Sequence, residues 1–145
     1  MIDNQSIQYS LENGLDWLLQ AAQALEYMHL YNILKHVHRD IKPLNMLWDE
    51  DYRTLKICDF GTTTVIDEEE LTKIYGTEVY MAPEIFDGKY TQKCDVYSWA
   101  ISLEHCVTRE MPFSSCRNDV DFQICKNSDF YQSQIPIETS EDAIK

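Results

Sequence analysis

A single stretch, His38-Arg39-Asp40-Ile41-Lys42-Pro43-Leu44-Asn45, constrains this chain more than any other segment. Fourteen residues after its end comes Asp59-Phe60-Gly61. The residues between the two stretches predict a hairpin with strands over 46–48 and 54–58. Because the outer ends of a hairpin lie side by side, the last residue of the first stretch and the first residue of the second should be neighbours. The sequence therefore predicts one site that combines acidic and amide side chains.

A third stretch, Gly76-Thr77-Glu78-Val79-Tyr80-Met81-Ala82-Pro83-Glu84, follows in order. Each stretch is a weak signal alone, but three in order at the correct spacing are not a chance match. Together they resemble the eukaryotic protein kinases. Residues 55–62 and 93–99 are most similar to the TGF-β-activated kinase group of MAP kinase kinase kinases, and the chain resembles a divergent or truncated relative. The resemblance runs from about Ile7 to Phe113 and fades after it.

The resemblance implies functions for five side chains. Asp40 would accept the proton of the substrate hydroxyl, and Lys42 would steady the transferred phosphoryl group, as in Ser/Thr-specific kinases. Asn45 and Asp59 would hold the magnesium ion that bridges the phosphates of ATP. Two oxygen ligands completed by phosphates and water suit magnesium, which keeps part of its hydration shell. Thr77 would bond to the catalytic Asp and Lys and favour Ser/Thr substrates.

The same resemblance implies an ATP-binding surface that includes Lys42, Asn45, Leu47, Cys58 and Asp59. Leu47 would form the floor under the adenine ring, and an ordinary core leucine is equally consistent with the sequence. Cys58 would lie at the back of the nucleotide pocket. A small buried residue is the simpler interpretation, because a reactive thiol needs a lowered pKa. The five cysteines have no paired spacing, so they predict free thiols in a reducing compartment.

Two long helices are predicted. After a possible N-cap at Ser10, apolar residues at three- and four-residue spacing predict a helix that ends near 31–32. Its expected core stripe consists of Leu11, Leu15, Leu18, Leu19, Ala22, Leu25 and Met28. A second helix is expected over about 94–108, with Asp95 near its start favouring the helix dipole. Its apolar residues should wrap much of its circumference, namely Val96, Trp99, Ala100, Leu103, Cys106 and Val107.

The expected fold is mainly α, in the α+β class, with one or two short two-stranded hairpins. By resemblance it corresponds to the large helical lobe of a kinase without the small N-terminal lobe, and Asp95 bonds the backbone of the His-Arg-Asp turn. Residues 1–145 would form one partial domain, ordered from about Leu11 to Phe113. Its expected parts are the catalytic loop at 38–45, the activation segment at 59–84, the central helix at about 94–108, and a poorly matched, truncated 114–145 with short helices near 119–126 and 135–138.

The activation segment is rich in hydroxyl groups. Thr72 stands where the resembled group carries an activating phosphosite, and solvation alone explains a Thr-rich loop equally well. The acidic run 67–70 is normally a solvated face. It could also imitate a loop phosphate that pairs with Arg39.

Charge limits the partners. The chain has 12 basic and 25 acidic residues and a net charge of −13, which disfavours nucleic acid and anionic membranes. A basic or neutral protein is a better match. No apolar run approaches the length of a membrane span, and residues 1–4 lack the features of a signal peptide, so a cytoplasmic location is expected.

Two functions remain. The first is a Ser/Thr kinase of MAP kinase kinase kinase type in stress or immune signalling, represented by a fragment. It would transfer the γ-phosphate of ATP to a downstream kinase and bind an activating or scaffold protein. The second is an inactive, pseudokinase-like binding module. The four retained residues Asp40, Lys42, Asn45 and Asp59 favour the first. The second is favoured by the absence of a Gly-rich turn, a strand Lys and a helix Glu before Ser10, and of an Arg partner for Glu84 before Lys145.

Overall fold

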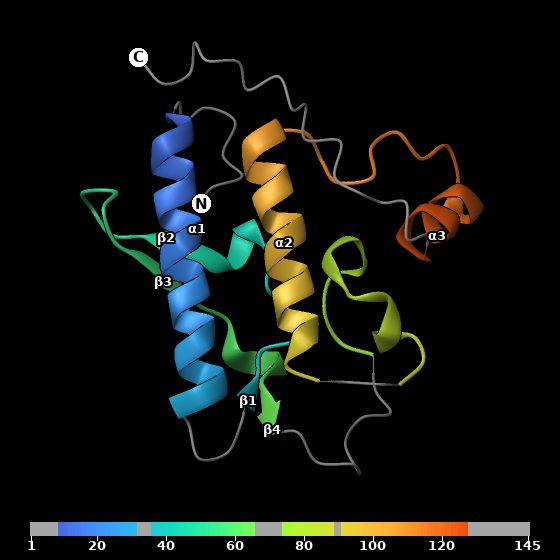
Figure 1. The fold of residues 1–145 in the computed structure, drawn as a ribbon, viewed down its shortest axis with the longest axis horizontal. Helices are drawn as coiled ribbons and strands as arrows, with labels where there is room; N and C mark the ends of the chain where they lie inside the picture. Colours follow the sequence, from blue (N-terminus) through green and yellow to red (C-terminus); the bar gives the residue numbers. More distant parts are fainter. Residues whose placement is uncertain (1–8, 32–35, 66–73, 89–90, 128–145) are drawn as a thin grey trace. The chain divides into compact units, whose positions relative to one another are not determined.

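The computed structural model of the chain describes residues 9–31, 36–65, 74–88 and 91–127. The chain divides into two compact units, Met1–Pro112 and Phe113–Lys145. All three of the sequence stretches that define the expected site belong to the first unit. Within that unit, helices α1 and α2 lie side by side and run in opposite directions (Figure 1).

Helix α1 spans Leu11–Glu26 and begins as the sequence predicts. The Ser10 hydroxyl accepts a hydrogen bond from the backbone N–H of Asn13 at 3.1 Å, which satisfies one of the free donors of the first turn. Glu12 lies in the first turn, where a negative charge interacts favourably with the helix dipole. The helix continues into a π-helical turn over Tyr27–Tyr31, so the predicted end near 31 is confirmed.

The predicted core stripe of α1 is wrong in part. Leu15 and Leu19 are 46% and 55% exposed, whereas Leu18 and Leu25 are buried as expected. Leucines occur on several sides of this helix, so spacing alone does not determine which side packs. Trp17 decides it, because its indole N–H donates to the backbone carbonyl of Tyr52 at 2.9 Å and the ring is buried. The buried side consists of Gly14, Trp17, Leu18, Ala21 and Leu25.

Helix α2 spans Lys93–Thr108, close to the predicted range. It is joined to α1 by the indole N–H of Trp99, which donates to the carbonyl of Leu18 at 2.8 Å. The expected apolar wrapping is wrong, since Val96 and Ala100 are exposed. Small and polar residues dominate the buried side because several of them form hydrogen bonds there. The buried residues are Cys94, Asp95, Ser98, Ile101, Ser102, His105 and Cys106.

Two small antiparallel sheets complete the first unit. Strands β2 (Met46–Trp48) and β3 (Leu55–Ile57) form the predicted hairpin, with Met46 opposite Ile57 and Trp48 opposite Leu55. Strands β1 (His36–Val37) and β4 (Thr64–Val65) pair at the two ends of the 38–63 segment, which contains the His-Arg-Asp and Asp-Phe-Gly stretches. Figure 1 shows this second pair near the end of α1 and the start of α2. Its pairing was not specified by the sequence, because each strand has only two residues.

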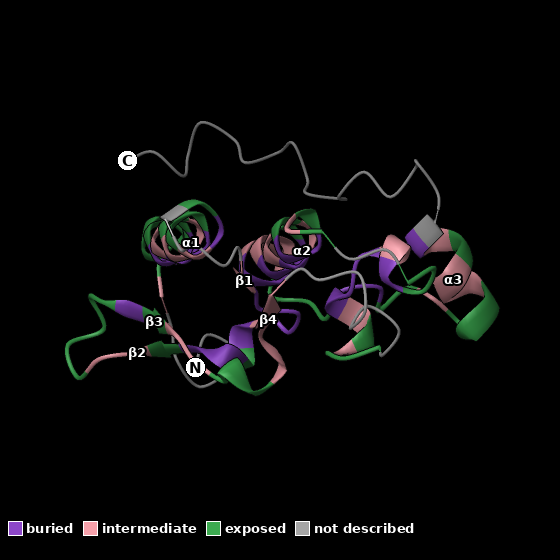
Figure 2. Ribbon diagram, turned by 90° about the horizontal axis from the view of Figure 1, so that it is seen from below, coloured by how far each residue is buried: buried purple, intermediate pink, exposed green. Residues whose placement is uncertain are grey.

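The described core of the first unit has two clusters of buried side chains. Figure 2 colours the buried residues of the ribbon purple. Ile41 belongs to the cluster under α1 and the β2–β3 hairpin, and Val37 belongs to the cluster under the 81–85 segment. The backbone between them carries the His-Arg-Asp stretch, which is therefore fixed at both ends by apolar burial. The first cluster consists of Trp17, Leu18, Ala21, Leu25, Ile41, Met46, Leu55 and Cys106, and the second of Val37, Met81, Ala82, Ile85 and Cys94.

The second unit contains helix α3, Asp119–Asn127, which confirms the short helix expected there. The Asn118 side-chain oxygen accepts the N–H of Asp121 at 2.9 Å, which caps its first turn. Phe122 packs edge-on against Phe113, with ring centroids 5.1 Å apart. The helix expected near 135–138 lies outside the described residues.

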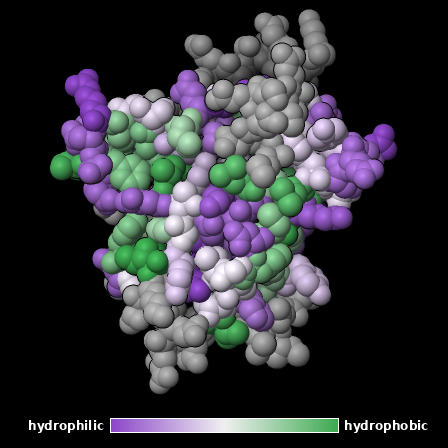
Figure 3. All heavy atoms as spheres, turned by 180° about the vertical axis from the view of Figure 1, so that it is seen from behind, coloured by the Kyte–Doolittle hydropathy of each residue, from purple (hydrophilic) through white to green (hydrophobic). Residues whose placement is uncertain are grey.

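The described surface mixes polar and apolar side chains. Figure 3 shows green hydrophobic patches separated by purple hydrophilic ones on one face. Exposed large hydrophobic residues include Leu30 and Val96. Among the described helices, none combines the length and the hydropathy that a membrane crossing requires.

The corrected face of α1 gives a direct test. We expect Leu18→Ala to lower the free energy of unfolding by about 2–5 kcal/mol, because it leaves a cavity in the core. The neighbouring Leu19→Ala should change it by no more than about 0.5 kcal/mol, because that side chain is exposed. Urea unfolding followed by circular dichroism measures both. Equal losses in the two variants would contradict this helix orientation.

Candidate functional site

The backbone of the His-Arg-Asp stretch is held by one buried carboxylate from α2. Asp95 Oδ2 accepts the N–H of His38 at 2.8 Å, and its Oδ1 accepts the N–H of Arg39 at 2.9 Å. Asp95 is completely buried. Arg39 has a left-handed backbone conformation with φ 70°, which non-glycine residues adopt at a cost. The two charge-assisted bonds hold this unfavourable turn in place, which confirms the contact expected of Asp95.

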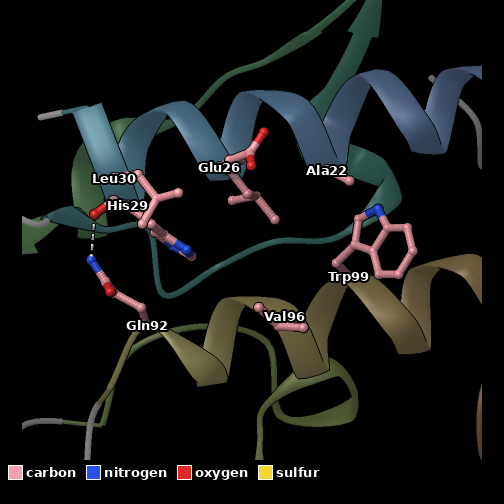
Figure 4. Close-up of a pocket in the computed structure, with 8 residues that line it drawn as sticks. Ala22, Glu26, His29, Leu30, Gln92, Val96 and Trp99 are labelled. Atoms are coloured by element: carbon pink, nitrogen blue, oxygen red, sulfur yellow. Dashed lines mark hydrogen bonds between the residues drawn. The ribbon is translucent and has the colours of Figure 1, made fainter.

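A third partner of Asp95 was missed by sequence reasoning. His29 Nε2 lies 2.9 Å from Asp95 Oδ2, and the imidazole is buried. Gln92, the residue before α2, also holds the π-helical turn that contains His29, because its side-chain amide donates to the carbonyl of His29 at 2.9 Å. Figure 4 shows His29, Leu30 and Gln92 where the end of α1 approaches the start of α2, beside a groove of about 350 Å³. Periodicity gave no signal for His29, because its partner is 66 residues away in the chain.

Three of the predicted site residues form a closed triangle of hydrogen bonds. Lys42 Nζ donates to Asp40 Oδ2 at 2.7 Å and to Thr77 Oγ1 at 2.6 Å. The Thr77 hydroxyl donates in turn to Asp40 Oδ1 at 2.9 Å. A hydroxyl can both accept and donate, so every contact of the triangle is satisfied. The structure therefore joins residues that are 37 positions apart in the sequence.

These contacts also determine the charge of Asp40. Burial alone would raise the pKa of this carboxyl, but hydrogen bonds from Lys42 and Thr77, the positive charge of Lys42 and a hydrogen bond from Asn45 outweigh it. The pKa of Asp40 therefore lies below its ordinary value, and the group is a carboxylate at neutral pH. A lowered pKa in the folded state stabilises the fold above the ordinary pKa of Asp. This stabilisation is lost as the pH falls through the lowered value.

The β2–β3 hairpin places Asn45 and Asp59 near its two outer ends, as predicted. The N–H of Cys58 donates to the carbonyl of Asn45 at 2.9 Å, which extends the strand ladder by one pair. Asp59 is the residue that follows this pair. Asp59 is exposed and has a left-handed conformation with φ 62°. The hairpin contacts the His-Arg-Asp stretch through His38 Nε2, which lies 3.1 Å from the carbonyl of Cys58.

Asn45 and Asp59 offer a suitable donor set for a hard cation. The amide nitrogen of Asn45 is used on Asp40, donating to its carbonyl at 2.8 Å, so the amide oxygen is the atom left to bind a metal. The carboxylate of Asp59 is the second oxygen donor. No cluster of three or more His, Cys, Asp or Glu side chains occurs in the part of the chain that the structure describes. A cation here would thus take its other ligands from phosphate or water, as magnesium does.

Leu47 and Cys58 occupy the same hairpin. Leu47 is 38% exposed, so its interpretation as an ordinary core leucine is wrong, and it could contact a ligand. Cys58 is half-buried. Burial and the nearby charge of Asp59 raise the pKa of its thiol, so the thiolate is scarce at neutral pH and reactivity is disfavoured.

Residues 75–77, which fall in the expected activation segment, pack closely on residues 39–42. Gly76 has φ 116°, and a Cβ at this position would lie 2.4 Å from the carbonyl oxygen of Arg39. Only glycine allows so close an approach. Thr72 and the acidic run 67–70 lie outside the described residues.

Comparison with known proteins gives a family match and several similar proteins. Residues 1–144 match the protein kinase domain family. The chain is 44% identical over 117 residues to mitogen-activated protein kinase kinase kinase 7 of Drosophila melanogaster, which covers 79% of this chain and 17% of that protein. It is 46% identical over 112 residues to a putative kinase kinase kinase 7-like protein of the same organism, covering 77% and 28% respectively. The human mitogen-activated protein kinase kinase kinase 7 is 42% identical over 106 residues, covering 72% and 17%. The chain thus spans less than a third of the length of these relatives.

The hydrogen-bond triangle predicts a measurable shift. Replacing Thr77 with Val removes one donor to Asp40, so we expect the pKa of Asp40 to rise toward its ordinary value. Thr77→Ser keeps the hydroxyl and should leave the pKa of Asp40 unchanged. A ¹³C NMR titration of the carboxyl carbons distinguishes the two variants. If both variants titrated like the unmodified chain, the donor assignment would be wrong.

Proposed function

Because this chain belongs to the protein kinase family, we propose that its first unit forms the large lobe of a Ser/Thr kinase of MAP kinase kinase kinase type. The reaction would transfer the γ-phosphate of ATP to a serine or threonine hydroxyl. The observation that supports this proposal best is the triangle of Asp40, Lys42 and Thr77. Kinase catalysis consists mainly of positioning and electrostatic stabilisation, and this triangle supplies both at one point.

In this proposal Asp40 receives the substrate proton. The hydroxyl oxygen forms a bond to the γ-phosphorus, the bond from the γ-phosphorus to the β,γ-bridging oxygen breaks, and the hydroxyl proton passes to Asp40. The lowered pKa of Asp40 keeps it ionised before the substrate arrives. Lys42, which is within hydrogen-bond distance of the same carboxylate, would place its positive charge beside the transferred group. Thr77 would hold both side chains in position.

Asn45 and Asp59 are the proposed magnesium ligands, and Leu47 is the proposed adenine contact. The two ligands contribute oxygen atoms from the ends of paired strands. A magnesium ion held there would neutralise the charge of the ATP phosphates. Lys42 and Cys58 would border the nucleotide, so the proposed cofactors are ATP and Mg²⁺.

The proposed substrate is a downstream protein kinase, as the names of the similar proteins suggest. The net charge of −13 favours an activating or scaffold protein with a basic or neutral surface. A cytoplasmic protein in stress or immune signalling would fit the resembled kinase group. The alternative is a pseudokinase-like binding module without catalysis. We favour the enzyme, because a binding module does not need the complete triangle together with the two metal ligands.

Two isosteric substitutions separate the proposed functions within the site. In a protein that joins this chain to a phosphate-covering small lobe, we expect Asp40→Asn to lower the transfer rate by about 100-fold or more, because it removes the proton acceptor. The Kd for Mg²⁺-ATP should stay nearly unchanged. Asp59→Asn should instead raise that Kd, because it removes a metal ligand. Nucleotide titration and single-turnover transfer measure both, with the exposed Asp51→Asn as the control.

Near-normal phosphate transfer in both Asp40→Asn and Asp59→Asn would show that the functions assigned to Asp40 and Asp59 are wrong.

The isolated 145-residue chain should transfer no measurable phosphate. The proposed acceptor and metal ligands belong to this chain, but without a phosphate-covering lobe the triphosphate would be poorly positioned, and misplacement by about 1 Å already costs on the order of 100-fold in rate. The net charge of −13 also repels the nucleotide. The measurement is transfer to a generic Ser/Thr substrate, with Asp40→Asn as the control. Activity that disappears in the control would contradict this expectation.

A further inference from the structure

Arg39 is a buried cation at the centre of the first unit. The whole residue is only 7% exposed, and its side-chain Nε–H donates to the carbonyl of Thr62 at 2.5 Å. Its guanidinium carbon lies 4.6 Å from the centroid of the Tyr75 ring. A cation over an aromatic face within about 6 Å is attracted by the ring's electron density, and the attraction is strongest where water is excluded.

Tyr75 begins a continuous line of contacts between the 75–77 segment and the catalytic stretch. The Tyr75 ring meets the Arg39 guanidinium, and Gly76 approaches the Arg39 carbonyl so closely that a Cβ could not fit. Thr77 then bonds to Asp40 and Lys42. Three consecutive residues of one segment thus contact the other segment. The Arg39 contact lies at one end of this line, and the Asp40 triangle lies at the other.

We propose that Tyr75 is a positioning residue: its unmodified ring holds the Arg39 guanidinium and thereby orders the catalytic stretch against the 75–77 segment. Kinase activation segments are commonly ordered by a loop phosphate that pairs with arginine. In this chain the aromatic ring supplies an attraction for the arginine without any added charge. The consequence for catalysis rests on the proposed function, but the contact itself does not.

The geometry explains why a ring suits this place. Arg39 is held at two points, because its backbone N–H donates to Asp95 Oδ1 and its side-chain Nε–H donates to the carbonyl of Thr62. The planar guanidinium can therefore present a face to Tyr75 while its Nε–H edge keeps the contact with Thr62. An aliphatic side chain of similar size could fill the space but would not attract the cation. The ring, rather than the volume or the hydroxyl, should be the property that matters.

Two variants of the full 145-residue chain test this, without nucleotide and without a transfer assay. Tyr75→Phe keeps the ring, and Tyr75→Leu replaces it with an aliphatic group. The four arginines give separable side-chain Nε–H signals in NMR spectra, and Arg39→Lys identifies the Arg39 signal. Arg109 lies 4.3 Å from the Tyr9 ring centroid and serves as an internal positive control, and the 85% exposed Arg53 serves as a negative one.

We expect the Arg39 signal of the unmodified chain and of Tyr75→Phe to lie upfield of its position in Tyr75→Leu, because the hydrogen bond to Thr62 is common to all three chains and only the ring current differs. The backbone amides of His38 and Arg39 should exchange with solvent about 2- to 30-fold faster in Tyr75→Leu, while those of α1 stay unchanged. If Tyr75→Leu does not fold, Tyr75→Met takes its place.

An Arg39 signal at the same position in the unmodified chain and in Tyr75→Leu would overturn the proposal. So would equal exchange in the Leu and Phe variants, because the ring would then not be the cause. Since no step measures catalysis, failure of the kinase assignment would leave these results unaffected.

Discussion

The rest of the first unit depends on the hydrogen bonds of one buried carboxylate, that of Asp95. It accepts hydrogen bonds from the backbone N–H groups of His38 and Arg39 and lies within hydrogen-bond distance of the His29 imidazole. It therefore joins α2, the His-Arg-Asp stretch and the turn that follows α1. A buried charge is tolerable only with such partners. Each charge-assisted bond contributes about 1.5–3 kcal/mol, enough to hold Arg39 in its left-handed conformation. Without this anchor the direction of the chain after Arg39 would not be fixed.

The position that Asp95 gives to Arg39 also determines the contacts of the residues that follow it. The turn at Arg39 leaves Asp40 within reach of Lys42 and Thr77, and the hydrogen bonds from these two side chains, together with the charge of Lys42, lower the pKa of Asp40 against the effect of its burial. Asn45 adds its amide to the same residue and passes the chain into the β2–β3 hairpin. The ionisation of Asp40, the position of the Asn45 side chain and the docking of residues 75–77 therefore all depend on the one short stretch 38–45.

The apolar core supports this polar network rather than containing it. Ile41 and Val37 are buried in two different clusters, and they fix the stretch at both ends. The side of α2 that faces the core is unusually polar, because Asp95 and Ser98 form hydrogen bonds there, Ser98 to the carbonyl of Tyr80 at 2.7 Å. The helix is thus a scaffold for hydrogen bonds as much as for hydrophobic packing. Burial of these groups is acceptable because each has its partner.

The sequence by itself determined the helices from Leu11 and over about 94–108 and the β2–β3 hairpin, and its motifs contain the three residues that the structure joins by hydrogen bonds, Asp40, Lys42 and Thr77. Local spacing, a capping serine and ordered motifs encode these features within short windows. Only the tertiary structure decided which side of α1 is buried, since Trp17 and not the leucine stripe makes the decisive contact. It also decided that His29 joins Asp95 and that Tyr75 covers Arg39. Such contacts join residues 36 or 66 positions apart, and no periodic pattern specifies which distant partner a buried charge will find.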